Sequence, residues 1–82
     1  MKENYITIYP NPVTDNLFID FATNNFLSSE VIITDATGKN VLIQNITSTN
    51  AKINIASFSK GIYFVSIKLD DAIIHTDSFV KQ

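Results

Sequence analysis

The side chains that could take part in catalysis are few in this chain of 82 residues. Its one histidine, His75, is followed two residues later by Asp77, so the two side chains would share one face of a β-strand. A His–Asp pair can act in acid–base chemistry, but a catalytic site also needs a nucleophile, an oxyanion site and a pocket. Ser78 would point to the opposite face of the strand. We therefore interpret His75 and Asp77 as a solvated surface pair and expect no catalytic residue.

Metal and cofactor sites are equally unsupported by the sequence. The adjacent carboxylates of Asp70 and Asp71 lack the spaced oxygen ligands of a calcium loop, and a turn accounts for both residues. Gly38 and Gly61 stand in unrelated turns and form no phosphate-binding loop. The chain has no cysteine, which excludes a disulfide, a thiol nucleophile and a thiolate metal site. We expect no cofactor and no metal.

Charge and hydropathy exclude two further classes of protein. The formal net charge is −2 and the six basic residues are scattered singly, whereas nucleic-acid binding requires a clustered basic patch. No segment approaches the roughly 18 apolar residues of a membrane-spanning helix. The length allows one hydrophobic core. We therefore expect a single domain, residues 1–82, without nucleic-acid binding or membrane insertion.

The elements that must position all these residues are β-strands. Apolar and polar residues alternate almost throughout, and no helical period of 3.6 residues is visible. Seven strands are predicted, and the residues that mark them are, in order, Ile6 and Ile8; Leu17, Ile19 and Phe21; Val31 and Ile33; Val41 and Ile43; Ile53 and Ile55; Tyr63, Val65, Ile67 and Leu69; and the segment from about Ala72 to Val80. Such short, regularly spaced strands are typical of an all-β, antiparallel β-sandwich of the immunoglobulin-like kind. A small barrel is the alternative.

Two turns define hairpins. Asp35 and Gly38 occupy the first and fourth places of a type I turn, which predicts a hairpin between Val31–Asp35 and Asn40–Asn45. The last hairpin is predicted to turn at Asp70 and Asp71.

A two-residue loop in the last hairpin would pair Leu69 with Ala72, Ile67 with Ile74 and Tyr63 with Ser78. This register places on the core side Ile74, Thr76 and Val80. It leaves His75 and Asp77 outward, and Phe79 beside Ile62 on the second face. A three-residue loop would reverse these faces.

Four motifs follow one another along the chain. They are Tyr9-Pro10-Asn11-Pro12 with Leu17-Phe18-Ile19; Asp35 with Gly38-Lys39 and Val41; Gly61-Ile62-Tyr63-Phe64-Val65; and Thr76 with Phe79-Val80-Lys81. In this order and at these separations the chain resembles, from about Tyr5 to Lys81, the C-terminal sorting domain (type A) of proteins exported by the type IX, or Por, secretion system. It differs at Asp77 and Ser78, where the family commonly has lysine, and at Asp70-Asp71, where the family turn commonly contains glycine.

The resemblance implies an address label that has no catalysis of its own. The domain would stand at the C-terminus of a longer secreted protein, attached in cis to an upstream cargo. It would be recognised in the periplasm by the type IX outer-membrane translocon, which exports the cargo to the cell surface or the medium. A sortase-like peptidase commonly removes the domain afterwards. No signal-peptide pattern follows Met1, so we expect residues 1–82 to be excised from that longer protein, and the isolated domain to be a monomer.

The resemblance and the physics of strand addition also assign roles to residues. A folded label can be recognised through a sheet edge or an extended terminal segment, so recognition is expected at the last strand and tail. These residues are Thr76, Phe79, Val80, Lys81 and Gln82, with Lys81 as the cation near the end. The remaining motif residues are expected to be structural, and they are Tyr9, Pro10, Asn11, Pro12, Asp35, Gly38, Lys39, Gly61, Tyr63 and Val65.

The alternative function is a β-sandwich adhesion or carbohydrate-binding accessory module of a secreted protein. Such a module requires a row of exposed aromatic rings that can stack on sugars. The candidates are Phe18, Phe26, Phe58 and Phe64, although at least two are expected to fill the ends of the small core.

Overall fold

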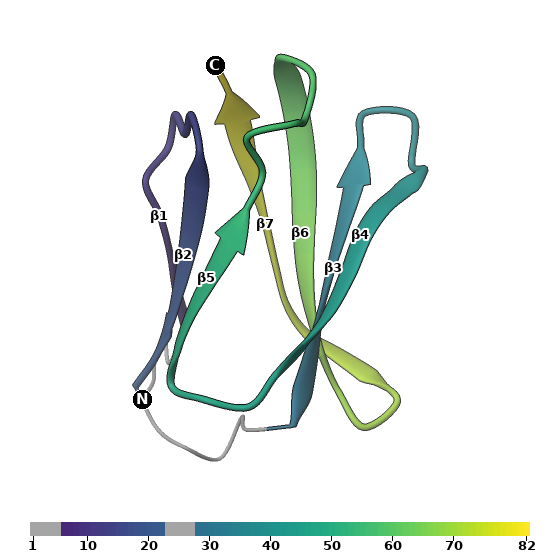
Figure 1. The fold of residues 1–82 in the computed structure, drawn as a ribbon. Coiled ribbons are helices and arrows are strands. Elements are labelled where there is room, and N and C mark those ends of the chain that lie inside the picture. The colour runs from purple at the N-terminus through teal and green to yellow at the C-terminus, as the bar shows by residue number, and fades with distance from the viewer. Residues whose placement is uncertain (1–5, 23–27) are drawn as a thin grey trace.

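Two antiparallel sheets pack face to face (Figure 1). The computed structural model describes residues 6–22 and 28–82, so the predictions for Tyr5 and Phe26 lie outside the described residues. The first sheet has the order β1-β2-β5, made of Ile6–Tyr9, Asn16–Phe21 and Asn50–Asn54. The second has the order β4-β3-β6-β7, made of Asn40–Ile46, Ser29–Asp35, Gly61–Leu69 and Ala72–Lys81. The all-β, seven-stranded sandwich predicted from the sequence is confirmed.

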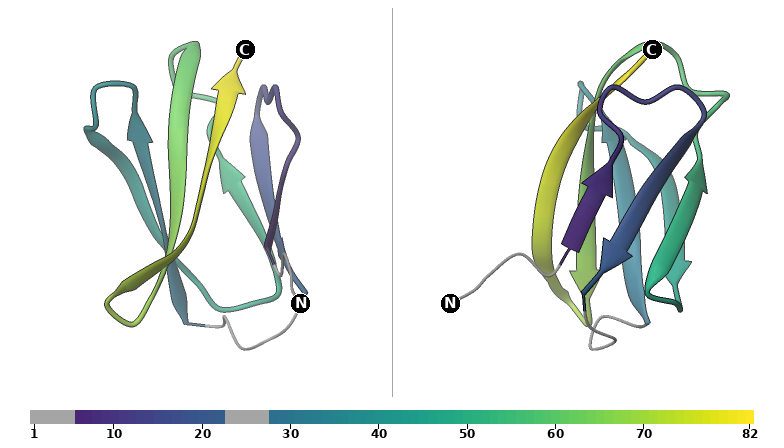
Figure 2. Two further views of the ribbon diagram at one scale, coloured as in Figure 1. Left: turned by 180° about the vertical axis from the view of Figure 1, so that it is seen from behind. Right: turned by 90° about the vertical axis from the view of Figure 1, so that its left-hand side faces the viewer.

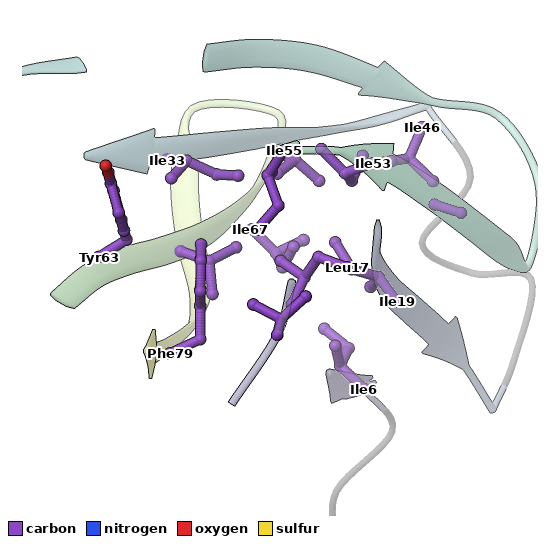
Figure 3. Packing of buried hydrophobic residues seen from close by; sticks show 14 of the residues in the cluster. Ile6, Leu17, Ile19, Ile33, Ile46, Ile53, Ile55, Tyr63, Ile67 and Phe79 are labelled. Atoms are coloured by element: carbon purple, nitrogen blue, oxygen red, sulfur yellow. The ribbon is translucent and has the colours of Figure 1, made fainter. Parts of the chain in front are cut away.

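The core lies between the sheets and consists mainly of branched aliphatic side chains (Figure 3). Each fully buried isoleucine or leucine contributes about 1.5–3 kcal/mol through removal of apolar surface from water. The alternation correctly identified the buried residues Ile6, Leu17, Ile19, Phe21, Val31, Ile33, Ile53, Ile55, Tyr63, Val65 and Ile67. Val13 and Ile46 are also buried, and the alternation did not single them out.

The fourth strand is confirmed, but its side chains at the core are Ile46, which is buried, and Leu42, which packs against the core. Ile33 pairs with Leu42 whereas Thr34 pairs with Asn40, so Val41 is an extra residue on β4. Both Val41 and Ile43, which marked this strand in the sequence, are exposed. The predicted hairpin between β3 and β4 is present.

The register predicted for the last hairpin is wrong beyond its first residues. Leu69 pairs with Ala72 across the predicted two-residue loop, and Lys68 pairs with Ile73. The register then shifts, because Ile67 pairs with His75 and leaves Ile74 as an extra residue on β7. One inserted residue moves every following side chain to the other face of the sheet.

This shift reverses the predicted faces of β7. Phe79 pairs with Tyr63 and is 1% exposed, with the two ring centroids 5.5 Å apart, so it belongs to the core and does not pack beside Ile62. Val80 is 39% exposed, and Ile74 and Thr76 are exposed too, so their predicted place on the core side is also wrong.

His75 and Asp77 were expected to point outward, and the register corrects this as well. They stand opposite the buried residues Ile67 and Val65, on the core-facing side of the sheet. His75 is half-buried, whereas Asp77 stays exposed on this edge strand.

Candidate recognition site

Parts of all four sequence motifs gather at one end of the sandwich, which we call the motif end. It contains the β1–β2 connection, the β3–β4 turn, the β5–β6 loop and the last residues of β7, all at the top of Figure 1 beside the C-terminus. The views in Figure 2 place the same segments together. Motif residues that are as far apart in the sequence as Tyr9 and Lys81 therefore lie at the same end of the domain.

Asn11 connects the first motif to the last. Its side-chain Oδ1 accepts a hydrogen bond from the backbone N–H of Val80 at 2.9 Å, and its Nδ2 donates to the Ser78 carbonyl at 3.5 Å. Both partners belong to edge strand β7, so the amide takes the place of a neighbouring strand's backbone. Unpaired edge groups otherwise remain open to other chains.

Val13 continues this pairing along β7. Its N–H donates to the Val80 carbonyl at 2.9 Å, and its carbonyl accepts from the Gln82 N–H at 2.8 Å, which makes a short parallel bridge beside Lys81. Pro10 and Pro12, which have no N–H to donate, flank Asn11 and are exposed. The segment between β1 and β2 thus joins the two sheets at the motif end.

Tyr9 belongs to a polar network on the outer face of the first sheet. Its hydroxyl donates to Asp20 Oδ2 at 2.7 Å, and Asn50 donates to Asp20 Oδ1 at the same distance. The hydrogen bonds from Asn50 and Tyr9 hold the pKa of Asp20 below its usual value, and the bond from Asn50 has the larger effect. The bond to Asp20 in turn raises the pKa of Tyr9. The ring of Tyr9 stacks on Phe18 at 5.6 Å.

The β3–β4 turn is organised by Asp35, as predicted. The Gly38 N–H donates to the Asp35 carbonyl at 3.0 Å, and Gly38 has a φ of +91°, which favours glycine. The Asp35 carboxylate accepts from the Thr37 hydroxyl at 2.6 Å and from the backbone N–H groups of Thr37 and Lys39. These bonds hold the pKa of Asp35 below its usual value, and the bond from the Thr37 hydroxyl has the largest effect.

A groove of about 510 Å³ lies between this turn and the β5–β6 loop. Gly61 starts β6 at the groove with a φ of +149°, again a conformation that favours glycine. Tyr63 lies below the surface and donates a hydrogen bond to the Ser59 carbonyl at 2.7 Å. Its ring contacts Phe58 on one side and Phe79 on the other, with centroids 5.1 and 5.5 Å away. The groove is lined by Asp35, Ala36, Thr37, Val41, Ser57, Phe58, Ser59, Lys60, Gly61, Ile62 and Tyr63.

The five residues predicted for recognition differ in accessibility. Thr76, Val80 and Gln82 are exposed, whereas Phe79 is in the core. Lys81 is only 8% exposed, and its ammonium group donates to the Gln82 carbonyl at 2.9 Å. The cation predicted near the end of the chain is therefore largely covered in the folded domain.

His75 and Asp77, the pair considered first for chemistry, differ in exposure, since His75 is half-buried and Asp77 is exposed. Asp77 accepts a hydrogen bond from the Ser78 N–H, and His75 Nε2 is screened from solvent without a hydrogen-bond partner among residues 6–22 and 28–82. In the same residues, no group of three or more His, Cys, Asp or Glu side chains could hold a metal ion. Of the four candidate sugar-binding aromatics, Phe64 is exposed, while Phe18 and Phe58 are half-buried.

A search for helices that could cross a membrane found none over the described ranges.

Comparison with known proteins decides the family. A profile of the secretion system C-terminal sorting domain family matches residues 7–82. The chain belongs to this family, the sorting domains of the type IX (Por) system. The sorting domain is also 33% identical, over 60 residues, to beta-agarase A of Zobellia galactanivorans; the match covers 73% of the chain but only 11% of that relative.

The fold of the sorting domain is that of a solved immunoglobulin-like β-sandwich. A crystal structure of a DUF3244 family protein from Bacteroides vulgatus superposes with a TM-score of 0.78 at 25% identity, covering 95% of this chain and 85% of that one. The family and fold together describe a sorting signal of a secreted, cell-surface or extracellular protein.

Two features of the site were missed by sequence reasoning. Asn11 was predicted to be structural without a partner for its side-chain amide, and Val13 was not considered. The signal in the sequence is an asparagine between two prolines. Since the prolines have no N–H to donate, the side-chain amide of the asparagine is the group that can make hydrogen bonds in their place. The sequence does not say which strand it would contact.

Proposed function

We propose that this domain is the C-terminal part of a longer secreted protein and is the label by which the type IX outer-membrane translocon exports the attached cargo. The observation that carries the proposal is the family match over residues 7–82, together with the position of all four motifs at one end of the fold. The domain passes through the periplasm folded and does no chemistry itself. A sortase-like peptidase then removes it, and the cargo is released or attached to the surface.

The direction of the chain supports this role. β1 begins at Ile6 at the end of the sandwich opposite to the C-terminus, as both views in Figure 2 show. A cargo domain upstream of Ile6 therefore leaves the motif end accessible. Within the last strand we assign recognition to the exposed residues Thr76, Val80 and Gln82, while Phe79 and Lys81 act through the fold.

The test is export of a fusion of signal peptide, reporter and this domain in a type IX-competent strain and in an isogenic strain without the translocon. Reporter on the surface or in the medium only when the translocon is present is the expected result. Intact, folded fusion that stays in the periplasm of both strains would contradict the proposal.

A further inference from the structure

The outer face of the second sheet carries a cluster of exposed apolar side chains that the core does not use. On β6, Ile62 and Phe64 point away from the core, because their neighbours Tyr63 and Val65 are buried. Val80 pairs with Ile62 and lies beside it on the same face. We name this cluster the outer apolar patch, and its exposed members are Val41, Ile43, Ile62, Phe64 and Val80.

The patch is continuous with the groove at the motif end. Val41 and Ile62 belong to both, so an occupant of the patch can extend one side chain into the groove. Ile43 is connected to the patch through half-buried Ile32, its partner on β3. Exposed, contiguous apolar surface on a folded domain commonly marks a binding site.

The charge of this face determines the chemistry of its partner. Charged residues on the outward positions of β3 and β6 are Glu30 and Lys68, which pair with each other at the end away from the motifs. From that pair to the motif end, the outward positions of these two strands and β7 are uncharged: Ile32, Thr34, Ile62, Phe64, Ser66, Thr76, Ser78 and Val80. A surface complementary to these strand positions is therefore apolar and uncharged, since a charged group would lose its hydration against them without gaining a partner.

The size of the face argues for a transient partner. The domain measures 33 × 23 × 23 Å, and the patch occupies part of one face. A stable interface of standard size takes roughly 20–30 residues from each partner, whereas the patch has the five exposed members named above. The patch by itself is therefore too small for a stable dimer of two copies. β1 also starts in the other sheet and at the opposite end of the sandwich from the motifs.

We propose that the outer apolar patch is the surface through which an uncharged, apolar face of the type IX outer-membrane machinery transiently holds the folded domain. The proposal rests on the sorting function above and names the contact that performs it. Ile62 and Phe64 are the central anchors, and Val80 adds the last strand to the same surface.

The test compares changes at two exposed parts of this face. The variant I62T/F64T removes the anchors. The variant I73T repeats the isoleucine-to-threonine change of I62T at the far end of the face, where Ile73 is 59% exposed against 54% for Ile62. Threonine preserves strand propensity, so we expect the fold to be retained. Export of the reporter fusion is measured for each, with the melting temperature and sedimentation of the free 82-residue domain.

The expected result is export of the I62T/F64T fusion reduced at least about tenfold, as for the loss of interface anchors, with I73T like wild type and all melting temperatures similar. Wild-type-like export of I62T/F64T, or equal losses in both variants, would overturn the proposal while the sorting function stands. Failure of the wild-type fusion to be exported would instead contradict the sorting function itself.

Should I62T/F64T not fold, V80T tests the same surface, because the backbone bonds of Val80 do not involve its side chain. A wild-type dimer that I62T/F64T dissociates would assign the patch to a second copy and overturn the proposal.

Discussion

Asn11 is the residue through which the first motif of the chain contacts the last, and its amide is a specific target for mutation. In N11A, the Val80 N–H loses its acceptor at an edge of the sandwich. We expect a loss of about 1 kcal/mol in the free energy of unfolding, which lowers the melting temperature by roughly 4–8 °C in a domain of this size. Thermal unfolding and hydrogen exchange of the Val80 amide measure the effect. N11D, which keeps an acceptor oxygen, is the control, and unchanged protection of the Val80 amide in N11A would contradict the assignment.

Asp35 and Asp20 make the stability of the domain depend on pH. Hydrogen bonds to both carboxylates lower their pKa in the folded state. The unfolded chain therefore binds protons more readily, so the stabilisation is complete above the unfolded pKa of about 3.9 and is lost as pH falls through the lower folded values. We expect urea midpoints that are constant near neutral pH and fall in this acidic range. The double variant D20N/D35N should show a smaller fall; an equal fall would assign the acid sensitivity to other groups.

At the scale of elements, the extra residue Ile74 determines which side chains of β7 enter the core. The structure predicts that F79A is severely destabilised, by about 3–5 kcal/mol, because a buried ring is removed. V80A should change the free energy of unfolding by less than about 0.5 kcal/mol, as is usual at exposed positions. If β7 had no extra residue, Val80 would face the core and Phe79 would face outward, so V80A would be the more destabilised variant. Chemical denaturation of the two variants therefore tests the position of the bulge, and greater damage in V80A would show that the register is wrong.

At the scale of the whole molecule, β7 is part of both the fold and the surface that we assign to recognition. Deleting residues 76–82 removes Phe79 from the core together with the partners of Asn11 and Val13. We expect the truncated domain to be unfolded by circular dichroism and unable to support export. The point variant Q82A should remain folded, so it separates recognition from stability. A truncated domain that melts cooperatively near the wild-type temperature would show that the last strand is dispensable for folding.

The sequence by itself determined the strands, most of the core and the family. Alternation of apolar and polar residues has a period of two, and this local pattern is enough to identify a strand and its buried face. The Asp35–Gly38 turn was predictable for the same reason, since its hydrogen bonds join residues at most four apart. The order and separation of the four motifs were enough to indicate the family, and the family match over residues 7–82 confirmed it.

Only the tertiary structure decided which face of β7 is buried and what Asn11 binds. A single inserted residue reverses the two faces of a strand, and neither Ile73 nor Ile74 is marked as the extra one by its side chain. The bond from Val80 to Asn11 joins residues 69 positions apart, and it exists because the two sheets meet at this edge. Lys81, predicted to be the cation near the end of the chain, is only 8% exposed, and its backbone forms a bridge with Val13. These contacts depend on how distant segments are placed, which local periodicity does not encode.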